Sequence, residues 1–402
     1  MKQYPNLRHV RLFCQCLQSG SVSRAADLVG ISQPAASQAL ARLEAIFDAT
    51  LIDPQHSTPV ATEEGRIVLT RAQRALELIR TGCARLRGPT NERNDSSVEG
   101  RLTISHLRAL SAFAEGGSFS AAARILEQSE PAVHRTARDA ELTLETALLE
   151  GSGRAIRLSS AGTSAARWSR LALNELENAA AELRELRGRY EGHVSVGTLP
   201  LVRTSIIPEV IARISARHPL ASFAVAEGRY DDLRRDLEMG RIEILVGALR
   251  TTLRSNMLVQ EKLFTYQLSV VARADHPLAA KKALTAAGLA EYPWVVARQG
   301  TPSRETFDAL TARFPPGRPA HRAVETGSLV AVRGILMKSD HLALLSQHQI
   351  EYEMRAGFLA PLDFDLPSPE HSIGMTTRRQ WKPTALQSEF IETLREIRPE
   401  GD

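Results

Sequence analysis

The segment from Gly20 to Glu44 most constrains how this 402-residue chain folds. Its pattern predicts a short helix, a tight turn and a second short helix. Ser21 is placed to cap the first helix, and Gly30 supplies the positive φ that ends it. Ser32 is placed to cap the second helix, whose first turn tolerates Pro34 because no N–H is needed there. The outer face of that helix is polar and carries Gln33, Ser37, Gln38 and Arg42. This arrangement is typical of a DNA-reading helix-turn-helix.

The same pattern occurs twice. A shift of 97 positions places Gly20 on Gly117, and eight of the sixteen positions from Gly20 to Ala35 are then identical. The match continues without a gap to Gly65 and Gly162. This predicts a duplicated domain, as a pair and not as the many short units of a solenoid.

Composition excludes some classes of function but does not identify one. Charged residues make up 24% of the chain and the formal net charge is +4, which is too mildly basic to establish nucleic-acid binding. Three irregularly spaced cysteines, two of them in the apolar helix at 7–18, predict buried thiols and no zinc site or disulfide framework. We expect no catalytic residues, cofactor or metal, because the sequence lacks a nucleophile elbow, a P-loop and a zincin motif. Without an export signal or membrane span, we expect a cytoplasmic protein with no membrane partner.

The chain reads as two cycles of the same elements followed by a third part. The expected domains are winged helix-turn-helix domain 1 at 1–62, pairing helix 1 at 63–87, a linker at 88–100, winged helix-turn-helix domain 2 at 101–160, pairing helix 2 at 161–191 and an effector-binding domain at 192–402. The wings fall at 51–62 and 148–159. Apolar residues step by four and three from Leu69 to Leu86 and from Ala172 to Tyr190, which predicts two coiled-coil seams.

The two seams have two ways to pair. They pair with each other inside one chain, or each pairs with its twin in a second chain and gives four DNA-reading heads per homodimer. Cys83 in the first seam and Tyr190 in the second differ in volume, and the polar faces of the two modules have diverged. These differences favour pairing within the chain.

The third part alternates strands with helices, which predicts α/β sheets with ligands at the carboxyl ends of the strands. Expected strands lie at 193–198, 222–227, 243–247, 267–272, 294–297 and 342–345. The first expected helix follows residues 200–203 and ends near residue 217. A second covers 230–239, and the closing helix covers 384–397.

The motifs at 7–13 (Leu-Arg-His-Val-Arg-Leu-Phe), 20–26 (Gly-Ser-x-Ser-x-Ala-Ala), 32–37 (Ser-Gln-Pro-Ala-x-Ser) and 42–44 (Arg-Leu-Glu) resemble the LysR-type transcriptional regulators. The resemblance implies an α/β multidomain fold that ends in a two-subdomain effector domain like periplasmic binding proteins. Subdomain I then comprises 193–266 and 372–398, and subdomain II comprises 267–371. A tandem pair of winged domains departs from the family norm. Segments 197–201, 245–249, 292–296 and 344–349 are similar to the galactose-binding-protein regulators and the aromatic-degradation regulators.

Candidate DNA contacts come from both modules, and we expect them at Ser21, Ser32, Gln33, Pro34, Ser37, Gln38, Arg42, Ser129, Arg135, Arg138, Arg154 and Arg157. Module one has Pro54 where the family's wing usually carries Arg. Module two replaces Gln33 with Glu130, which repels phosphate but suits cytosine N4. A degenerate second module that serves dimerisation alone is the alternative.

Candidate effector contacts lie where two strands run into helix starts, which suits a carboxylate or a hydroxylated sugar. They are Thr198, Leu199, Pro200, Arg203, Gly247, Arg298, Gln299, Gly300, Thr301, Thr326 and Ser328. In the simpler alternative Thr198 and Ser328 are ordinary caps and the arginines are solvated.

The sequence thus predicts a LysR-type regulator whose operator binding or activation responds to a sugar or a small organic or aromatic acid. Its expected partners are double-stranded DNA, the effector, further copies of the chain in a dimer or tetramer, and RNA polymerase. The alternative is an architectural two-headed DNA-binding protein with a vestigial ligand domain.

Overall fold

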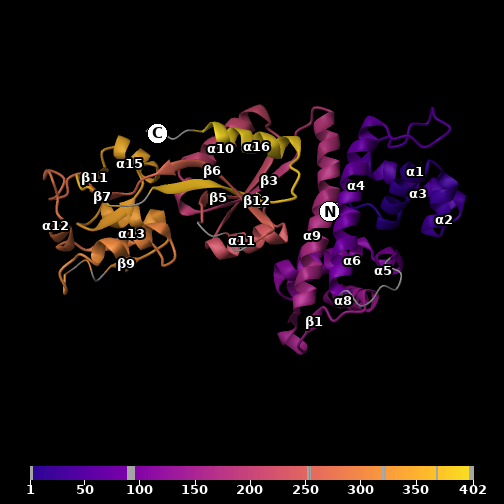
Figure 1. The fold of residues 1–402 in the computed structure, drawn as a ribbon, viewed down its shortest axis with the longest axis horizontal. Coiled ribbons are helices and arrows are strands. Elements are labelled where there is room, and N and C mark those ends of the chain that lie inside the picture. Colours follow the sequence, from indigo (N-terminus) through magenta and orange to yellow (C-terminus); the bar gives the residue numbers. More distant parts are fainter. Residues whose placement is uncertain are drawn as a thin grey trace. The chain divides into compact units, whose positions relative to one another are not determined.

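The computed structural model describes residues 3–87, 96–250, 253, 255–318, 320, 323–367 and 370–397. The chain forms two compact units. The first, here called the helical unit, comprises Met1–Gly192, Glu238–Arg241 and Thr384–Leu386. The second, the sheet unit, comprises His193–Leu237, Ile242–Pro383 and Gln387–Asp402. Each is described by itself below (Figure 1).

The first three-helix set consists of α1 (Leu7–Ser19), α2 (Val22–Val29) and α3 (Gln33–Phe47). The Ser21 hydroxyl accepts a hydrogen bond from the Arg24 N–H, and Gly30 ends α2 at φ 70°, so both predicted helix signals are confirmed. Pro34 lies in the first turn of α3, as predicted. The predicted cap by Ser32 is wrong, because its side chain makes no capping hydrogen bond although it occupies the N-cap position.

A second set follows with the same lengths: α6 (Ile104–Gly116), α7 (Phe119–Leu126) and α8 (Glu130–Leu144). Ser118 caps α7 as Ser21 caps α2. Glu127 replaces Gly30 at the turn and adopts φ 54°, a left-handed conformation that costs a side-chain residue more than glycine. The Phe113 and Phe119 rings, with centroids 4.6 Å apart, fill the small core of this set.

Each set is joined to its wing and its long helix by the same two devices. The Glu44 carboxylate accepts from the backbone N–H groups of Leu51 and Ile52, at 2.8 and 3.3 Å. Glu141 does the same, at 2.8 and 2.9 Å, for the residues 97 positions later. A Cβ on Gly65 would lie 2.0 Å from the Leu51 carbonyl oxygen. The close approach of the long helix to this segment therefore requires glycine at position 65.

The two wings differ. The second is a short antiparallel hairpin of β1 (Leu149–Glu150) and β2 (Arg157–Leu158). The first, predicted as a β-wing over 51–62, has only a single bridge between Ile52 and Ala61. Pro54 and Pro59 explain this difference, since neither has the N–H that a longer ladder needs.

The long helices α4 (Glu63–Arg87) and α9 (Ser160–Leu186) pack against each other inside one chain (Figure 1). They are antiparallel, because Arg187 contacts Glu64 near one end and Trp168 faces Gly82 near the other. Their buried side chains form one core with the two helix sets; from α4 and α9 these are Val68, Ala72, Ala75, Ile79, Cys83, Ala165, Ala166, Trp168, Ala172, Leu173, Leu176, Ala179 and Leu183. The predicted intrachain pairing is therefore what the structure shows.

Two sequence expectations about the helical unit are corrected. The second seam does not reach Tyr190: Leu186 is 42% exposed, and α9 ends before Gly188, which has φ 72°. The predicted linker at 88–100 contains a helix, α5 (Ser96–Arg101). Val98 buries its side chain in the core, and the Arg11 guanidinium donates to the carbonyls of Glu99 and Gly100. Residues 88–95 lie outside the described part of the chain.

The sheet unit contains two five-stranded mixed sheets. The first has the order β4-β3-β5-β12-β6 and the second β11-β7-β10-β8-β9. The strands of the first are β3 (His193–Thr198), β4 (Ser222–Glu227), β5 (Ile244–Ala248), β6 (Leu258–Tyr266) and β12 (His371–Arg378). Those of the second are β7 (Ser269–Arg273), β8 (Trp294–Val296), β9 (Val324–Glu325), β10 (Leu342–Leu345) and β11 (Leu359–Pro361). The chain crosses from the first sheet to the second after β6 and returns before β12.

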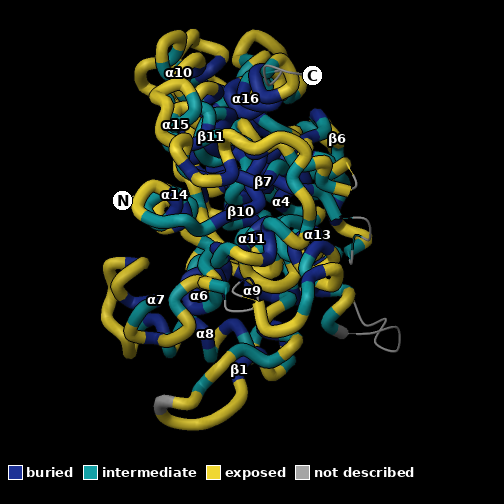
Figure 2. The backbone as a smooth tube through the Cα atoms, turned by 90° about the vertical axis from the view of Figure 1, so that its left-hand side faces the viewer, coloured by how far each residue is buried: buried dark blue, intermediate teal, exposed yellow. Residues whose placement is uncertain are grey.

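Helices accompany these sheets: α10 (Ile206–Arg217), α11 (Tyr230–Met239), α12 (Ala286–Ala290), α13 (Pro302–Thr311), α14 (Leu329–Leu336), α15 (Glu351–Arg355) and α16 (Ala385–Glu396). The central strands carry the core: every residue of β10 is buried, and β7 and β10 appear dark in Figure 2. Among the described residues, no helix is long and apolar enough to cross a bilayer. All three cysteines are buried, as predicted, and none is in a disulfide.

Candidate nucleic-acid interface and effector site

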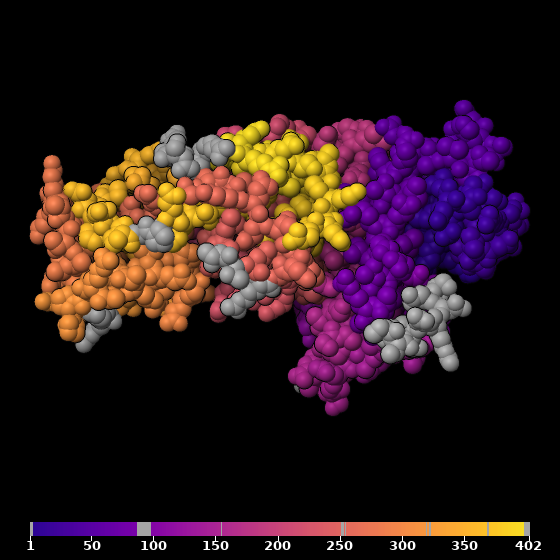
Figure 3. Space-filling model, in the orientation of Figure 1, coloured from indigo at the N-terminus to yellow at the C-terminus, as the bar shows by residue number. Residues whose placement is uncertain are grey.

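Helix α3 has one buried and one polar face. Ala36, Ala39 and Leu43 are buried, while all five residues singled out on the helix are exposed: Gln33, Pro34, Ser37, Gln38 and Arg42. The part of the chain that contains α3 is drawn in indigo in Figure 3. Within the described part of the chain, the Gln33, Ser37 and Gln38 side chains make no hydrogen bond to protein. Their donors and acceptors are therefore available to a partner such as a row of base edges.

The residues beneath α3 fix its position. The Arg8 guanidinium donates to the carbonyls of Val29 and Gly30, at 3.2 and 2.8 Å, and so holds the turn that leads into α3. Burial, followed by the charges of Arg42 and Arg8, lowers the pKa of His9. His9 is therefore mostly neutral at pH 7 and adds no positive charge next to Arg42.

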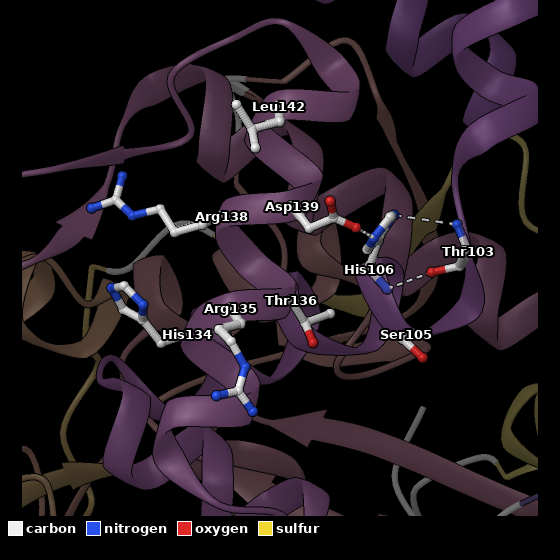
Figure 4. Close-up of a pocket in the computed structure, with 9 residues that line it drawn as sticks. All are labelled: Thr103, Ser105, His106, His134, Arg135, Thr136, Arg138, Asp139 and Leu142. Atoms are coloured by element: carbon white, nitrogen blue, oxygen red, sulfur yellow. Dashed lines mark hydrogen bonds and ion pairs between the residues drawn. The ribbon is translucent and has the colours of Figure 1, made fainter.

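Helix α8 presents a different set of side chains from the equivalent face (Figure 4). Glu130, His134, Arg135 and Asp139 occupy the positions of Gln33, Ser37, Gln38 and Arg42. Asp139 accepts from the ring of buried His106, with Nε2 and Oδ2 2.7 Å apart. In Figure 4 Arg135 and Arg138 extend away from that pair.

The other predicted contacts of module two are partly engaged with protein groups. Arg138 lies 2.6 Å from Glu141, the residue that anchors the wing. Arg157 is 78% exposed and pairs across the hairpin with Glu150 at 2.8 Å. Ser129 and Ser21 begin helices, and Ser129 makes no capping bond. The Arg154 side chain lies outside the described residues.

The first half of the predicted effector site is filled by protein groups. Thr198 is fully buried, and the Arg203 guanidinium donates to its carbonyl and hydroxyl oxygens while pairing with Glu227 at 3.1 Å. The Leu199 N–H donates to the Val246 carbonyl, and Pro200 has no N–H. The first two backbone positions after Thr198 therefore offer no free N–H to an anion. Gly247 lies beneath the Leu199 side chain, which would be 2.5 Å from a Cβ there, and so serves packing.

The second half is more open. Arg298, Gln299 and Gly300 are exposed, and Gly300 turns the chain at φ 73° into α13. Thr301 caps α13 and Ser328 caps α14, with hydroxyls that accept from backbone N–H groups. The Thr326 hydroxyl accepts from the Ser328 N–H at 3.1 Å. Among the described residues, the Arg298 guanidinium has no carboxylate partner; it lies over Gly327, where a Cβ would be 3.0 Å from Nε.

Sequence reasoning missed two aromatic groups of the sheet unit. The Arg250 guanidinium lies 4.5 Å from the centroid of the Tyr230 ring. The Tyr266 ring stacks on His371 with centroids 5.2 Å apart, and its buried hydroxyl has no hydrogen-bond partner among the described groups. Burial raises the pKa of Tyr266 well above its ordinary value. A buried phenol without a partner is a donor that a ligand can satisfy.

Comparison with known proteins places these observations in a family. The family model described as the LysR substrate binding domain matches residues 187–398. The model for bacterial regulatory helix-turn-helix proteins of the lysR family matches residues 7–66 and again residues 104–163.

Individual relatives agree with these models. The HTH-type transcriptional regulator GalR of Pseudomonas putida is 33% identical over 385 residues, which cover 94% of this chain and 93% of that protein. A full-length OxyR variant of Pseudomonas aeruginosa superposes with a TM-score of 0.55 at 22% identity, over 73% of this chain and 94% of that one. Full-length CbnR in complex with its target DNA gives a TM-score of 0.50 at 18% identity, over 73% of this chain and 99% of that one. These two structures support the fold alone. The chain belongs to the LysR family of DNA-binding transcriptional regulators.

Proposed function

We propose that this regulator reads its operator with the exposed face of α3, assisted by α8, and responds to a small anionic or polyhydroxyl metabolite bound in the sheet unit. The exposed polar face of α3 is the observation that carries the first part. Glutamine pairs with the N6 and N7 edge of adenine, arginine with the O6 and N7 edge of guanine, and serine with several bases. Gln33, Ser37 and Arg42 thus form a reading set worth about 1–3 kcal/mol per lost base contact.

The second module supports a DNA role of its own. Arg135 is exposed on α8, at a position where it suits guanine or a phosphate. Glu130 is an acceptor for cytosine N4, and Asp139 is held in place by His106. A module kept for dimerisation alone has no need of this exposed arginine.

For the effector we propose a site centred on Arg298. An unpaired guanidinium binds a carboxylate through two parallel hydrogen bonds. The Tyr266 phenol and Arg250 are further polar groups of the same unit that suit an acid or a hydroxylated ring. Since Arg203 is already paired with Glu227, we assign it to the support of Thr198. We propose that RNA polymerase and further copies of the chain are partners during regulation.

The DNA proposal is tested by selecting binding sites from random DNA with the full-length chain. Affinity for the selected site is then measured at one fixed salt concentration for Gln33→Ala and Ser37→Ala. We expect about 5- to 150-fold weaker binding and relaxed base preference. Gln73→Ala, exposed on α4, is the matched control and keeps wild-type affinity. Unchanged affinity and base preference in both α3 variants would refute the assignment.

The effector proposal is tested by thermal stabilisation with a panel of small acids and sugars. A ligand that raises the melting temperature of the wild type is then tested on Arg298→Gln. We expect the stabilisation to be lost there and retained in Arg313→Gln, which changes an exposed arginine in the same part of the chain. A normal response of Arg298→Gln would show that the ligand binds elsewhere.

A further inference from the structure

We propose that α4 and α9 form a pair that neither helix forms with a copy of itself, so that one chain presents two unlike reading helices to an asymmetric DNA site. The statement about DNA rests on the function proposed above. The statement about pairing stands on the helix interface alone.

One half of the interface is a buried ion-pair cluster. Arg71 is 2% exposed, and its guanidinium donates to Glu175 at 2.9 Å and to Glu182 at 3.0 Å. Arg74 adds a second contact to Glu175 at 3.0 Å. Two arginines meet two glutamates, so the cluster is neutral as long as both helices contribute to it.

The pseudo-symmetric half of the interface is apolar. The 97-residue shift places Trp168 where the first half has Arg71. Trp168 is 3% exposed and packs on Gly82, where a Cβ would lie 2.4 Å from the ring atom Cδ1. The positions equivalent to Glu175 and Glu182 are Leu78 and Arg85. The two halves of the interface are therefore chemically unlike.

This difference opposes homotypic pairing. In a pair of α4 helices with the same register, Arg71 would face Leu78 and Arg85 and would lose both carboxylates. In a pair of α9 helices, Glu175 and Glu182 would face Trp168, and each Trp168 would meet Ala179 in place of Gly82. Buried charges without partners and a methyl group inside an occupied space both disfavour these arrangements. Only α4 with α9 gives Arg71 both of its carboxylates and places a glycine against Trp168.

The consequence for DNA comes from the two reading helices. Because a chain carries one α3 and one α8, its two half-sites are read by different side chains. Arg42 stands where the second module has Asp139, so the charge at that position is opposite. The partner that fits is a DNA site whose two halves differ in sequence.

A charge-reversal experiment tests the pairing. We expect Arg71→Glu alone and Glu182→Arg alone to lower the melting temperature of the full chain by about 5 °C or more. Both changes in one chain restore it, because the two positions then carry opposite charges again with their signs exchanged. Arg80→Glu, on the exposed side of α4, is the control and changes it little. Arg71→Glu and Glu182→Arg chains refolded together remain destabilised if the pair forms within a chain. Restoration in that mixture would show pairing between chains and overturn the proposal.

The sites selected from random DNA test the asymmetry. We expect two unlike half-sites, one altered by Gln33→Ala and the other by Arg135→Ala. Two identical half-sites, or changes in both halves from either variant, would overturn this part. If the wild type selects no sequence, the proposed function fails, while the melting experiment still decides the pairing.

Discussion

Because Gly82 contacts Trp168, we expect that replacing this glycine by alanine does not stabilise the helix, contrary to the usual effect. Replacing glycine by alanine inside a helix normally stabilises it by about 0.5–1 kcal/mol. At position 82 the new methyl group would lie 2.4–2.6 Å from three atoms of the Trp168 ring. Overpacking of this kind costs about 1–3 kcal/mol. We therefore expect Gly82→Ala to destabilise the helical unit or, at most, to leave its stability unchanged.

Gly334 in α14 provides the matched control, because no atom lies within 4 Å of the Cβ it would gain. Gly334→Ala should stabilise by the ordinary helix propensity. The difference between the two variants in the free energy of unfolding, measured by urea denaturation, should be about 1–3 kcal/mol. In a Trp168→Leu background the penalty at position 82 should shrink. If Gly82→Ala stabilises as much as Gly334→Ala, the packing described for α4 and α9 is wrong.

Three further predictions address other parts of the molecule. Glu141→Gln weakens two charge-assisted bonds to the wing, and we expect a loss of about 1–2 kcal/mol in urea denaturation; a wild-type value would contradict this. Arg135→Ala should relax the base preference of one half-site at fixed salt, and an unchanged base preference with a slope of log affinity against log salt lowered by about one would contradict this by making Arg135 a phosphate contact. Burial lowers the pKa of His276, whose Nδ1 accepts the Leu278 N–H, so the unfolded chain binds more protons. The contribution of neutral His276 to the free energy of unfolding is full above about pH 6.5 and is lost as the pH falls below it. His276→Asn should weaken this pH dependence.

Strongly periodic segments were predictable to the residue. The bounds of α4, β4, α11 and β10 agree with the sequence expectation, because each is set by local signals: a regular apolar repeat, a β-branched or apolar run, or a flanking glycine. The α3 face was predictable for the same reason. Its buried alanines recur at helical spacing, and polar residues lie between them.

Features that depend on distant contacts were missed. Helix α5 forms where composition indicated a linker, because Val98 is buried and Arg11 binds the carbonyls at the end of the helix. The pairing of Arg203 with Glu227 depends on the register of β3 and β4, which the sequence does not show. Glu44 is a case where a signal existed: it recurs as Glu141 in the ungapped match, and both anchor a wing.

Photocrosslinking shows directly which half-site α3 and α8 each contact. A photoreactive amino acid is placed in turn at the positions of Ser37, His134 and Gln73 in the full-length chain bound to its selected DNA. Ser37 and His134 are equivalent positions of α3 and α8, and Gln73 is exposed on α4. We predict that position 37 crosslinks to one half-site, that position 134 crosslinks to the other, and that position 73 does not crosslink. DNA that is bound without a crosslink from position 37 would show that α3 does not read the operator.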